Sequence, residues 1–526
     1  MFAACIAGAA GLSLLLGQDA NWDLQNYHYY NPWAWVHGQR GYTRDIVAAQ
    51  LQTYHNPLPD LPFYQMVKER WDPQGIAMAM AIPAGIAAFF LWKLLTVLFR
   101  DLPRRERWVA VGAAFAIGIT SGIGFGVLGT TMNEWPGTAL TVAALYVIAR
   151  ALAVRDVSRL SWRPLVLAGL LCGFATGVKF TFGVFAVGLC AALLLRGPWR
   201  RDASRARVGE AFVFGVAVLA GTLATAGAWM WSLWKYFRNP IFPYANIWIK
   251  SPWWGEYEVM GRPFGPHTVL EWLAFPFTLA APPPFYVTEM TYVDGRIPAV
   301  YGLVLIVAAA ALPALWRRQR RTPDPAAAVA APWRVLGIFV AVSFVLWTAQ
   351  YSILRYLVPL ELVSGALIVG LLGRLVRPAA RIPVAVAAAA ALIGTTTIPD
   401  WWRVEFGREW FEVALPPLEK DGLFLLTTDA PMSYVLPAFP KDARFLGIDN
   451  NISDARRKTL MEEAIRRTIR EHRGPLYSLS YPTGSGVDAL LERGIYKITE
   501  TCIPIITNMR TSPIELCRVV RSPDAP

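Results

Sequence analysis

Long apolar runs recur along this chain and limit what it can fold into more than any other feature of the sequence. A helix needs roughly 18 or more apolar residues to cross the hydrocarbon layer of a membrane, and several runs reach or approach that length. Only 17% of the 526 residues are charged, whereas a soluble protein carries about a quarter. We therefore predict an all-α polytopic membrane domain with about eleven crossings, and not a large soluble protein. The expected spans are 2–17, 76–98, 108–128, 136–153, 164–178, 180–196, 211–231, 298–316, 334–350, 356–373 and 382–398.

Arginine-rich connections predict how these spans are oriented. The net charge is +13, and the arginines gather in connections that share one side if each span crosses once. Cytoplasmic loops of membrane proteins carry the excess of Lys and Arg, so this side is predicted to be cytoplasmic. A nucleic-acid partner is excluded, because no basic face with interleaved stacking aromatics remains. The connections are 98–108, 149–163, 196–209, 316–324 and 373–381.

The remaining connections are then predicted to lie outside, together with the C-terminal tail. They are the first loop (18–75), a short connection at 130–136, the large loop (232–297) and a short connection at 351–356. Within the large loop, 238–273 is rich in Pro, Gly and aromatic residues. We expect it to line one cavity with 53–71 of the first loop, as a cover that excludes water from a reaction centre.

The composition changes after residue 398, which predicts a second domain. Residues 1–398 are expected to form the membrane domain and 399–526 a small periplasmic α/β domain. A helix signal runs over 453–474, with a Ser/Asp start and a Gly stop. The β-like runs are 422–428, 475–480 and 496–501.

Cys502 and Cys517 both lie in this tail. An oxidising compartment there would permit a disulfide between them. Two core thiols in adjacent strands are the alternative, and both possibilities stay open from the sequence alone.

Polar residues crowd the stretch that follows the first span, WDLQNYHYYNPWAWVHGQRGYTRDI (22–46). Its aromatic rings are compatible with an interfacial belt, but a belt does not explain the accompanying Asn26 and His28. Asp23 is expected at the depth of lipid head groups, with Tyr27 nearby and Asp19 as its close competitor.

A second acid and two cations are predicted at a similar depth. Glu134 opens a span after a very short connection, although an acid there also suits the helix dipole. Lys179 stands between two apolar segments and either marks a helix end or faces a polar cavity. Arg355 is an isolated cation at a helix start, where the dipole does not favour it. The acids suit deprotonating an acceptor or holding Mg²⁺ or Mn²⁺, and the cations suit a phosphate.

Four motifs, in this order, resemble the GT-C glycosyltransferases, membrane enzymes that use polyprenyl-phosphate sugar donors. They are DLQNYHYYNPWAWVHG from Asp23, NEWPGTALTVAALYVIARA with Glu134, AGLLCGFATGVKFTFG with Lys179, and RYLVP with Arg355 and Tyr356. The resemblance covers roughly residues 1–398 and implies that Asp23 is the catalytic base. The chain departs from the family in having Asp-Leu where Asp-Glu is usual, and RNPIFPYAN (238–246) matches no subfamily with a known substrate.

These observations predict a hexosyl- or pentosyltransferase in a bacterial inner membrane, with its active site on the periplasmic side. It would move a sugar from a polyprenyl-phosphate donor to a glycan, lipid or protein acceptor. Arg238 and His267 of the large loop are further expected substrate-binding residues. A lipid-linked sugar transporter or flippase is one alternative, although polar groups at mid-membrane and internal repeats are lacking. An O-antigen ligase or polymerase is the other, since His267 resembles the loop histidine of such enzymes.

Overall fold

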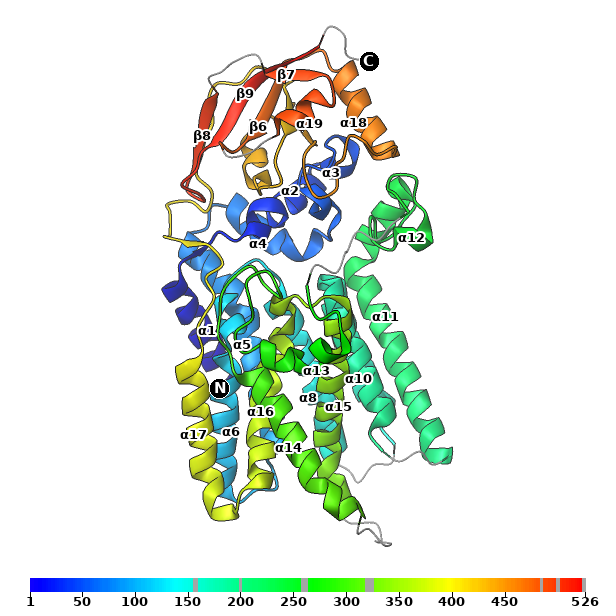
Figure 1. Ribbon diagram of the computed structural model, residues 1–526, viewed down its shortest axis with the longest axis vertical. Coiled ribbons are helices and arrows are strands. Elements are labelled where there is room, and N and C mark those ends of the chain that lie inside the picture. Colours follow the sequence, from blue (N-terminus) through cyan, green and yellow to red (C-terminus); the bar gives the residue numbers. More distant parts are fainter. Residues whose placement is uncertain are drawn as a thin grey trace.

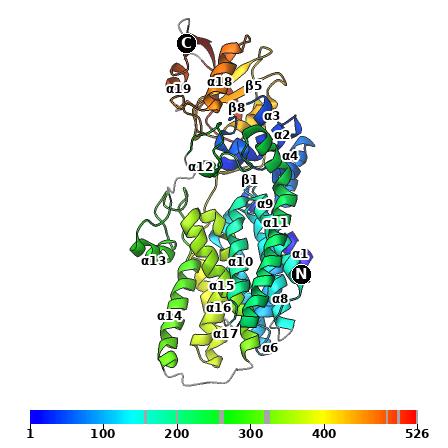
Figure 2. The ribbon, with the colours of Figure 1, turned by 90° about the vertical axis from the view of Figure 1, so that its right-hand side faces the viewer.

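The computed structural model describes residues 1–154, 159–197, 201–256, 264–316, 326–482, 486–497 and 502–522. Helices form one long bundle, a small sheet domain lies at one end of it, and the first loop lies between the two (Figure 1). The view at right angles shows the same three parts following one another along the long axis (Figure 2).

Among the described residues, six helices are long and apolar enough to cross a membrane, and the chain is a helical multi-pass membrane protein. These six stretches are Pro73–Leu98, Glu134–Ala153, Asp202–Phe237, Ala331–Gln350, Leu354–Leu375 and Pro378–Thr395. Helical structure also lies within each of the other expected spans, in shorter pieces. The bundle consists of α1 (Phe2–Leu16), α5 (Pro73–Leu98), α6 (Arg104–Ile119), α7 (Gly122–Gly126), α8 (Glu134–Val154), α9 (Trp162–Val178), α10 (Gly183–Leu195), α11 (Arg201–Phe237), α14 (Arg296–Trp316), α15 (Ala326–Gln350), α16 (Val358–Leu375) and α17 (Arg381–Thr395).

The expected span 108–128 is broken, because α6 ends at Ile119 and the short α7 follows it. The side chain of Arg296 is fully buried at this break. It donates to the carbonyl oxygens of Ile117 and Thr120, each at 2.7 Å. A helix end leaves its last carbonyls without partners, so this arginine stabilises the early end of α6 from another helix.

The first loop consists of short helical pieces and is largely buried between the bundle and the sheet domain. Large side chains in it, such as Tyr30, Tyr54 and Phe63, are at most 1% exposed. The pieces are η1 (Leu24–His28), α2 (Tyr30–Val36), α3 (Arg40–Thr43), η2 (Gln50–Tyr54), η3 (Leu58–Asp60) and α4 (Leu61–Lys68). The large loop carries α12 (Asn246–Ile249) and α13 (Val269–Thr278), and η4 (Phe180–Phe182), η5 (Leu354–Leu357) and η6 (Pro378–Ala380) connect bundle helices.

The C-terminal sheet has the strand order β3-β8-β9-β6-β4-β5, with β7 also paired to β9. At its centre β4 is parallel to both β5 and β6, and β9 is antiparallel to its partners. The β-like runs 422–428 and 475–480 contain β4 and β6. The third run, 496–501, starts within β7, and its residues 498–501 lie outside the described residues. The elements are β3 (Val413–Ala414), β4 (Leu423–Leu426), η7 (Ser433–Ala438), β5 (Arg444–Gly447), α18 (Leu460–Glu471), β6 (Leu476–Ser480), α19 (Val487–Leu491), β7 (Ile495–Lys497), β8 (Ile503–Thr507) and β9 (Ile514–Arg521).

The first loop and the C-terminal tail, which we predicted on the same side of the membrane, are in direct contact. At their beginnings, β1 (Gln18–Asp19) pairs with β2 (Arg403–Val404). Further along the loop, Ile46 forms a parallel bridge with Leu446 at the β5 edge. The first loop therefore adds a bridge at the β5 edge of the sheet, and the loop and the sheet domain lie at the same end of the bundle.

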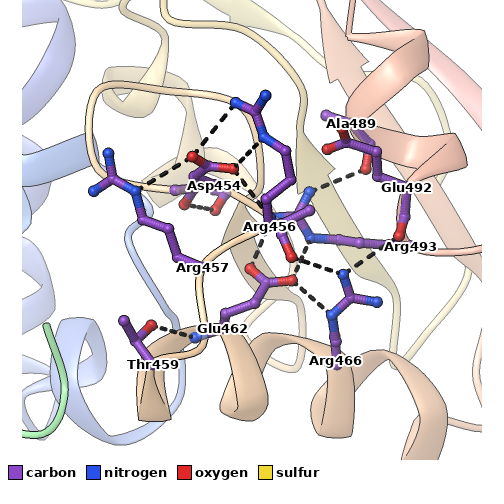
Figure 3. Close-up of polar contacts among 12 residues, drawn as sticks. Asp454, Arg456, Arg457, Thr459, Glu462, Arg466, Ala489, Glu492 and Arg493 are labelled. Carbon is purple, nitrogen blue, oxygen red and sulfur yellow. Dashed lines mark hydrogen bonds and ion pairs between the residues drawn. The ribbon is translucent and has the colours of Figure 1, made fainter. Parts of the chain in front are cut away.

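The helix signal over 453–474 begins too early, because α18 starts only at Leu460. Thr459 caps it, with its hydroxyl accepting from the Glu462 N–H at 3.3 Å. The preceding residues form a turn in which Asp454 pairs with Arg456 and Arg457 (Figure 3). Local side-chain bonding of this kind competes with helix formation, which explains the late start.

Cys502 and Cys517 form a disulfide with a Cα–Cα distance of 4.5 Å, so the first of the two sequence alternatives is confirmed. It joins β9 to the residue before β8.

Replacing both cysteines with Ser should destabilise the sheet domain by about 3 kcal/mol, because the unfolded chain regains the freedom of a closed loop. The loop spans 15 residues. Thermal unfolding of the purified protein measures the loss. Cys5→Ser, which removes a free thiol, is the control, and equal melting of both variants would contradict the prediction.

Candidate active site

Asp23 and Arg355 meet in the structure although the first loop and η5 are far apart in sequence. Asp23 directly precedes η1 and is 4% exposed. Its Oδ2 accepts a hydrogen bond from Nη1 of Arg355, and the two charges form an ion pair. Asp23 and Arg355, which the sequence pointed to separately, therefore form one ion pair.

Glu134 and Lys179 form a second pair beside the first. Glu134 is the first residue of α8 and is 1% exposed, and Lys179 directly follows α9. The Lys179 ammonium donates to Glu134 Oε1 at 2.5 Å and to the Met132 carbonyl oxygen at 3.1 Å. Oε2 of Glu134 is buried and has no hydrogen-bond partner among the described residues. It is therefore the oxygen available to a ligand.

The ring of Tyr356 joins the two pairs. Lys179 Nζ lies 4.7 Å from the ring centroid, and Arg355 Cζ lies 5.6 Å from it. A cation within about 6 Å of an aromatic face is attracted to it. Both cations are thus held at one aromatic ring, which makes the four charged side chains a single cluster.

Close packing of α9 against α11 positions Lys179. Glycines recur every four residues on α9, and a methyl group at Gly173 would lie only 2.2 Å from the Val218 carbonyl oxygen of α11. Small residues at this spacing let two helices approach closely. Asn56 of the first loop then donates to the Gly177 carbonyl oxygen at 2.9 Å, close to the end of α9.

The electrostatics of Asp23 balance two opposing effects. Burial alone would raise the pKa of its carboxyl group, but nearby positive charge, above all that of Arg355 and also that of Lys179, outweighs burial and holds the pKa below its usual value. The carboxylate is therefore ionised at neutral pH. Its basicity therefore depends on the ion pair with Arg355, because that positive charge lowers the pKa.

Asp19, the alternative base, has its carboxylate fully used in the structure. Oδ1 accepts from the backbone and side-chain nitrogens of Asn21, and Oδ2 accepts from the backbone and hydroxyl of Thr131. It is 0% exposed. Asp19 therefore ties the first loop to the connection before α8, and no oxygen is left for a substrate.

The other predicted residues of the first loop surround Asp23. The rings of Tyr27 and His28 lie with their centroids 4.1 Å apart and their planes tilted by 37°, and both are buried. Asn26 donates to Gln52 Oε1 at 3.2 Å, while its own Oδ1 is buried without a described partner. The structure thus brings Asn26, Tyr27 and His28 into the same buried turn that follows Asp23.

Two polar links at this site were not predicted. Asp60 accepts from His28 Nδ1 and from Asn133 Nδ2, each at 2.8 Å. His55 Nε2 and the Tyr244 hydroxyl are 2.7 Å apart. Asp60 and His55 stand in the Pro-broken part of the first loop, where no local pattern distinguishes a site residue from a loop residue.

The link between His55 and Tyr244 brings the beginning of the large loop onto the first loop, whereas the prediction was for all of 238–273. Arg238, in contrast, has an exposed side chain just after α11, and His267 is exposed just before α13. Residues 257–263, which were part of the expected cover, lie outside the described residues. The structure therefore brings together the predicted site residues except Arg238, His267 and the alternative base Asp19, whose carboxylate is bound to Asn21 and Thr131.

A divalent metal held by Asp23 and Glu134 does not fit the pairs as they stand. Each carboxylate is already neutralised by a cation. Among the described residues, Cys502, Glu515 and Cys517 are the one cluster of three metal-ligating groups, and its two cysteines are in the disulfide. We derive no reaction step through a metal.

The imidazole of His55 should remain neutral in the folded protein. Burial lowers its pKa to about 3, and the charges of Lys179 and Arg355 act in the same direction. Between the unfolded value of 6.5 and that folded value, the unfolded chain binds a proton that the folded protein does not. Stability is therefore lost as the pH falls through this window.

Thermal unfolding tests this proton linkage. From about pH 7 to about pH 5, His55→Gln should lose less stability than the unmodified protein, because the linkage is absent. Gln can still bond the Tyr244 hydroxyl, so it is a conservative change. An equal loss of stability in the two proteins would contradict the prediction, because His55 would then bind its proton in the folded state as readily as in the unfolded chain.

Comparison with protein-family models and with curated proteins finds no match. Solved structures are similar at low identity. ArnT from Cupriavidus metallidurans in the apo state shares 12% identity at a TM-score of 0.49, over 98% of this chain and 97% of that chain. The same protein bound to undecaprenyl phosphate gives a TM-score of 0.47 with the same identity and coverage.

The archaeal oligosaccharyltransferase AglB from Archaeoglobus fulgidus, in complex with an inhibitory peptide and a dolichol-phosphate, is also similar. It shares 13% identity at a TM-score of 0.44, over 91% of this chain and 69% of that chain. With all of these TM-scores below 0.5, we transfer no residue role from these structures. The chain is thus similar in structure, at low sequence identity, to the GT-C glycosyltransferases ArnT and AglB.

Proposed function

We propose that this protein is an integral-membrane glycosyltransferase that moves a sugar from a polyprenyl-phosphate donor to a glycan, lipid or protein acceptor. The observation that carries the proposal is the buried cluster in which Asp23 pairs with Arg355 and Glu134 pairs with Lys179. It supplies a carboxylate to accept a proton and two cations to bind a phosphate, as such a transfer requires.

In the proposed reaction the donor phosphate competes with the carboxylates for the two cations. Arginine binds phosphate through parallel hydrogen bonds, so Arg355 would turn from Asp23 towards the donor. Burial raises the pKa of Asp23 while the charge of Arg355 lowers it. Withdrawal of Arg355 would therefore make Asp23 a stronger base only when the donor is bound.

The transfer itself then follows from these positions. The acceptor hydroxyl gives its proton to Asp23, and its oxygen forms a bond to the anomeric carbon of the sugar. The bond from that carbon to the phosphate oxygen breaks, and its electron pair leaves with the polyprenyl phosphate. Arg355 and Lys179 stabilise the developing negative charge, which is the step that electrostatic catalysis accelerates.

Glu134 has a different part in this proposal. One of its oxygens binds Lys179 and the other is buried without a described partner. We propose that the second oxygen accepts from a sugar hydroxyl and orients the donor. Asn26, Tyr27, His28 and Tyr356 would complete the binding site, since they surround the same cluster.

The alternative of a ligase or polymerase depended on His267. Its side chain is exposed just before α13 and is not part of the described cluster. The transferase with Asp23 as its base is therefore the better supported function.

We propose that the sheet domain and the site face the periplasm across a bacterial inner membrane. The two arginine-rich connections that the structure describes in full, between α5 and α6 and between α16 and α17, lie at the opposite end of the bundle (Figure 1). Basic connections of short length stay in the cytoplasm. The disulfide in the sheet domain also suits an oxidising compartment.

Single cysteines test this topology in intact cells. Arg470 on α18 and Arg105 on α6 are both exposed and lie at opposite ends. A membrane-impermeant thiol reagent should label Arg470→Cys without lysis and Arg105→Cys only after lysis. The opposite pattern would place the site in the cytoplasm and remove the proposed orientation.

Asp23→Asn should lower turnover roughly 10²- to 10⁴-fold, the usual cost of losing a general base. The assay uses the purified protein in nanodiscs with a panel of polyprenyl-phosphate sugars and a membrane extract as the acceptor source. Release of polyprenyl phosphate is measured. Thermal unfolding shows whether the variant is folded.

Asp19→Asn is the matched control, since Asp19 lies four positions earlier in the same loop and is also buried. It should lower the melting temperature, because it disturbs hydrogen bonds to Thr131, but leave turnover per folded molecule near that of the unmodified protein. Full turnover by Asp23→Asn would remove Asp23 as the base. Loss in Asp19→Asn alone would move that role to Asp19.

A further inference from the structure

Asp60 occupies a place between the two acids of the site. It ends η3 in the first loop and is 3% exposed. Oδ2 accepts from His28 Nδ1 at 2.8 Å, and Oδ1 accepts from Asn133 Nδ2 at 2.8 Å. Both oxygens of one buried carboxylate thus hold side chains from two different segments.

The two segments are those that carry Asp23 and Glu134. His28 is the last residue of η1, the turn that Asp23 opens. Asn133 directly precedes Glu134 and has a φ of 64°, a left-handed conformation that is uncommon for a residue with a side chain. A conformation of this kind persists when its surroundings hold it in place, and Asp60 supplies a bond that does so.

The bond to Asp60 also decides which nitrogen of His28 is left for other partners. A carboxylate that accepts from Nδ1 fixes the proton on that nitrogen and leaves Nε2 as a hydrogen-bond acceptor in the neutral ring. Nε2 is buried and has no partner among the described residues. His28 ends the turn that Asp23 opens, which puts this imidazole near the proposed base.

We infer that Asp60 is a positioning residue of the active site, which sets the distance between Asp23 and Glu134 and aims His28 Nε2 at the acceptor side of the cluster. This inference rests on the proposed function and extends it. Asp60 itself touches neither donor nor acceptor. It acts through His28 on the turn of Asp23 and through Asn133 on the start of α8.

Asp60→Asn is the sharpest change, because the shape is kept while one acceptor oxygen is lost. An asparagine has one carbonyl oxygen and one NH₂ group. Its oxygen can keep the bond from Asn133 Nδ2, but its NH₂ group then faces His28 Nδ1. The imidazole must either shift or move its proton to Nε2, and in both cases Nε2 is no longer held in place as an acceptor.

Two measurements separate positioning from binding. Turnover of Asp60→Asn should fall about 10²-fold, since a misplacement of about 1 Å can cost that much. The dissociation constant for undecaprenyl phosphate, used as the probe, should stay within about twofold, because Lys179 and Arg355 are unchanged. A loss of turnover at constant affinity is the expected signature.

Asp45→Asn is the matched control for burial and charge in the same loop. Asp45 is 2% exposed, but its partners are Tyr30, Arg40 and the Phe445 backbone, away from the cluster. It should lower the melting temperature and leave turnover per folded molecule unchanged. Equal loss of turnover per folded molecule in Asp60→Asn and Asp45→Asn would overturn the inference. The loss would then follow from removing any buried acid of the loop and not from the contacts of Asp60.

Single-bond variants keep the test decisive if Asp60→Asn does not fold. His28→Gln and Asn133→Ala each remove one partner, and each should lower turnover. Asn133→Ala, which is not among the proposed binding residues, should do so without weakening undecaprenyl phosphate binding. Where Asp60→Asn does fold, its double variant with His28→Gln should be no worse than the poorer single variant, as expected for residues acting as one unit. Fully additive losses would overturn the link through His28.

The outcome also separates this inference from the proposed function. Normal turnover by Asp60→Asn with an inactive Asp23→Asn overturns only the positioning role. Normal turnover by Asp23→Asn overturns the proposed base, and with it the reason for holding that base in place.

Discussion

Two ion pairs, Asp23 with Arg355 and Glu134 with Lys179, are the constraint on which the rest of this structure depends; the acids are buried and the cations partly buried. Removing an ion from water costs several kcal/mol unless an opposite charge and further hydrogen bonds compensate. Each pair joins segments that are distant in sequence. The first loop, the start of α8, the end of α9 and η5 must therefore converge before any of these charges can be buried.

The first loop has little regular structure, so its shape comes from the parts on either side. On the bundle side, Asp19 binds Thr131 and Asn56 binds the Gly177 carbonyl oxygen. On the sheet side, Ile46 pairs with Leu446. A loop held on both faces can keep a buried polar cluster in one geometry, which short helical pieces could not do alone. The sheet domain thus contributes to the site without supplying any of its four charged residues.

The balance of charge within the cluster gives it a further property. Both cations are paired, so the site without a substrate contains no free positive charge among these four residues. A phosphate that displaces the carboxylates would release a base at the moment when a leaving group is bound. Coupling of this kind would protect the donor from reaction with water, in line with the general advantage of assembling a catalytic site upon binding.

Local sequence patterns were enough for the helices, the central strands and the identities of the charged residues, because apolar length, capping and loop charge depend on residues close together in the chain. These patterns were not enough to predict which side chains bind each other. Asp60 binds Asn133 across 73 positions, and Arg355 binds Asp23 across 332. Even the beginning of α18 was misplaced, since it depends on side-chain bonds in the preceding turn. The sequence by itself determined which segments are apolar enough to enter a membrane and which acids and cations are present. Only the tertiary structure decided that Asp19 is a structural tie, that Asp23 is paired with Arg355 and that Asp60 links the segments of the two acids. These contacts depend on which distant groups the packing of helices and loop brings within hydrogen-bond distance.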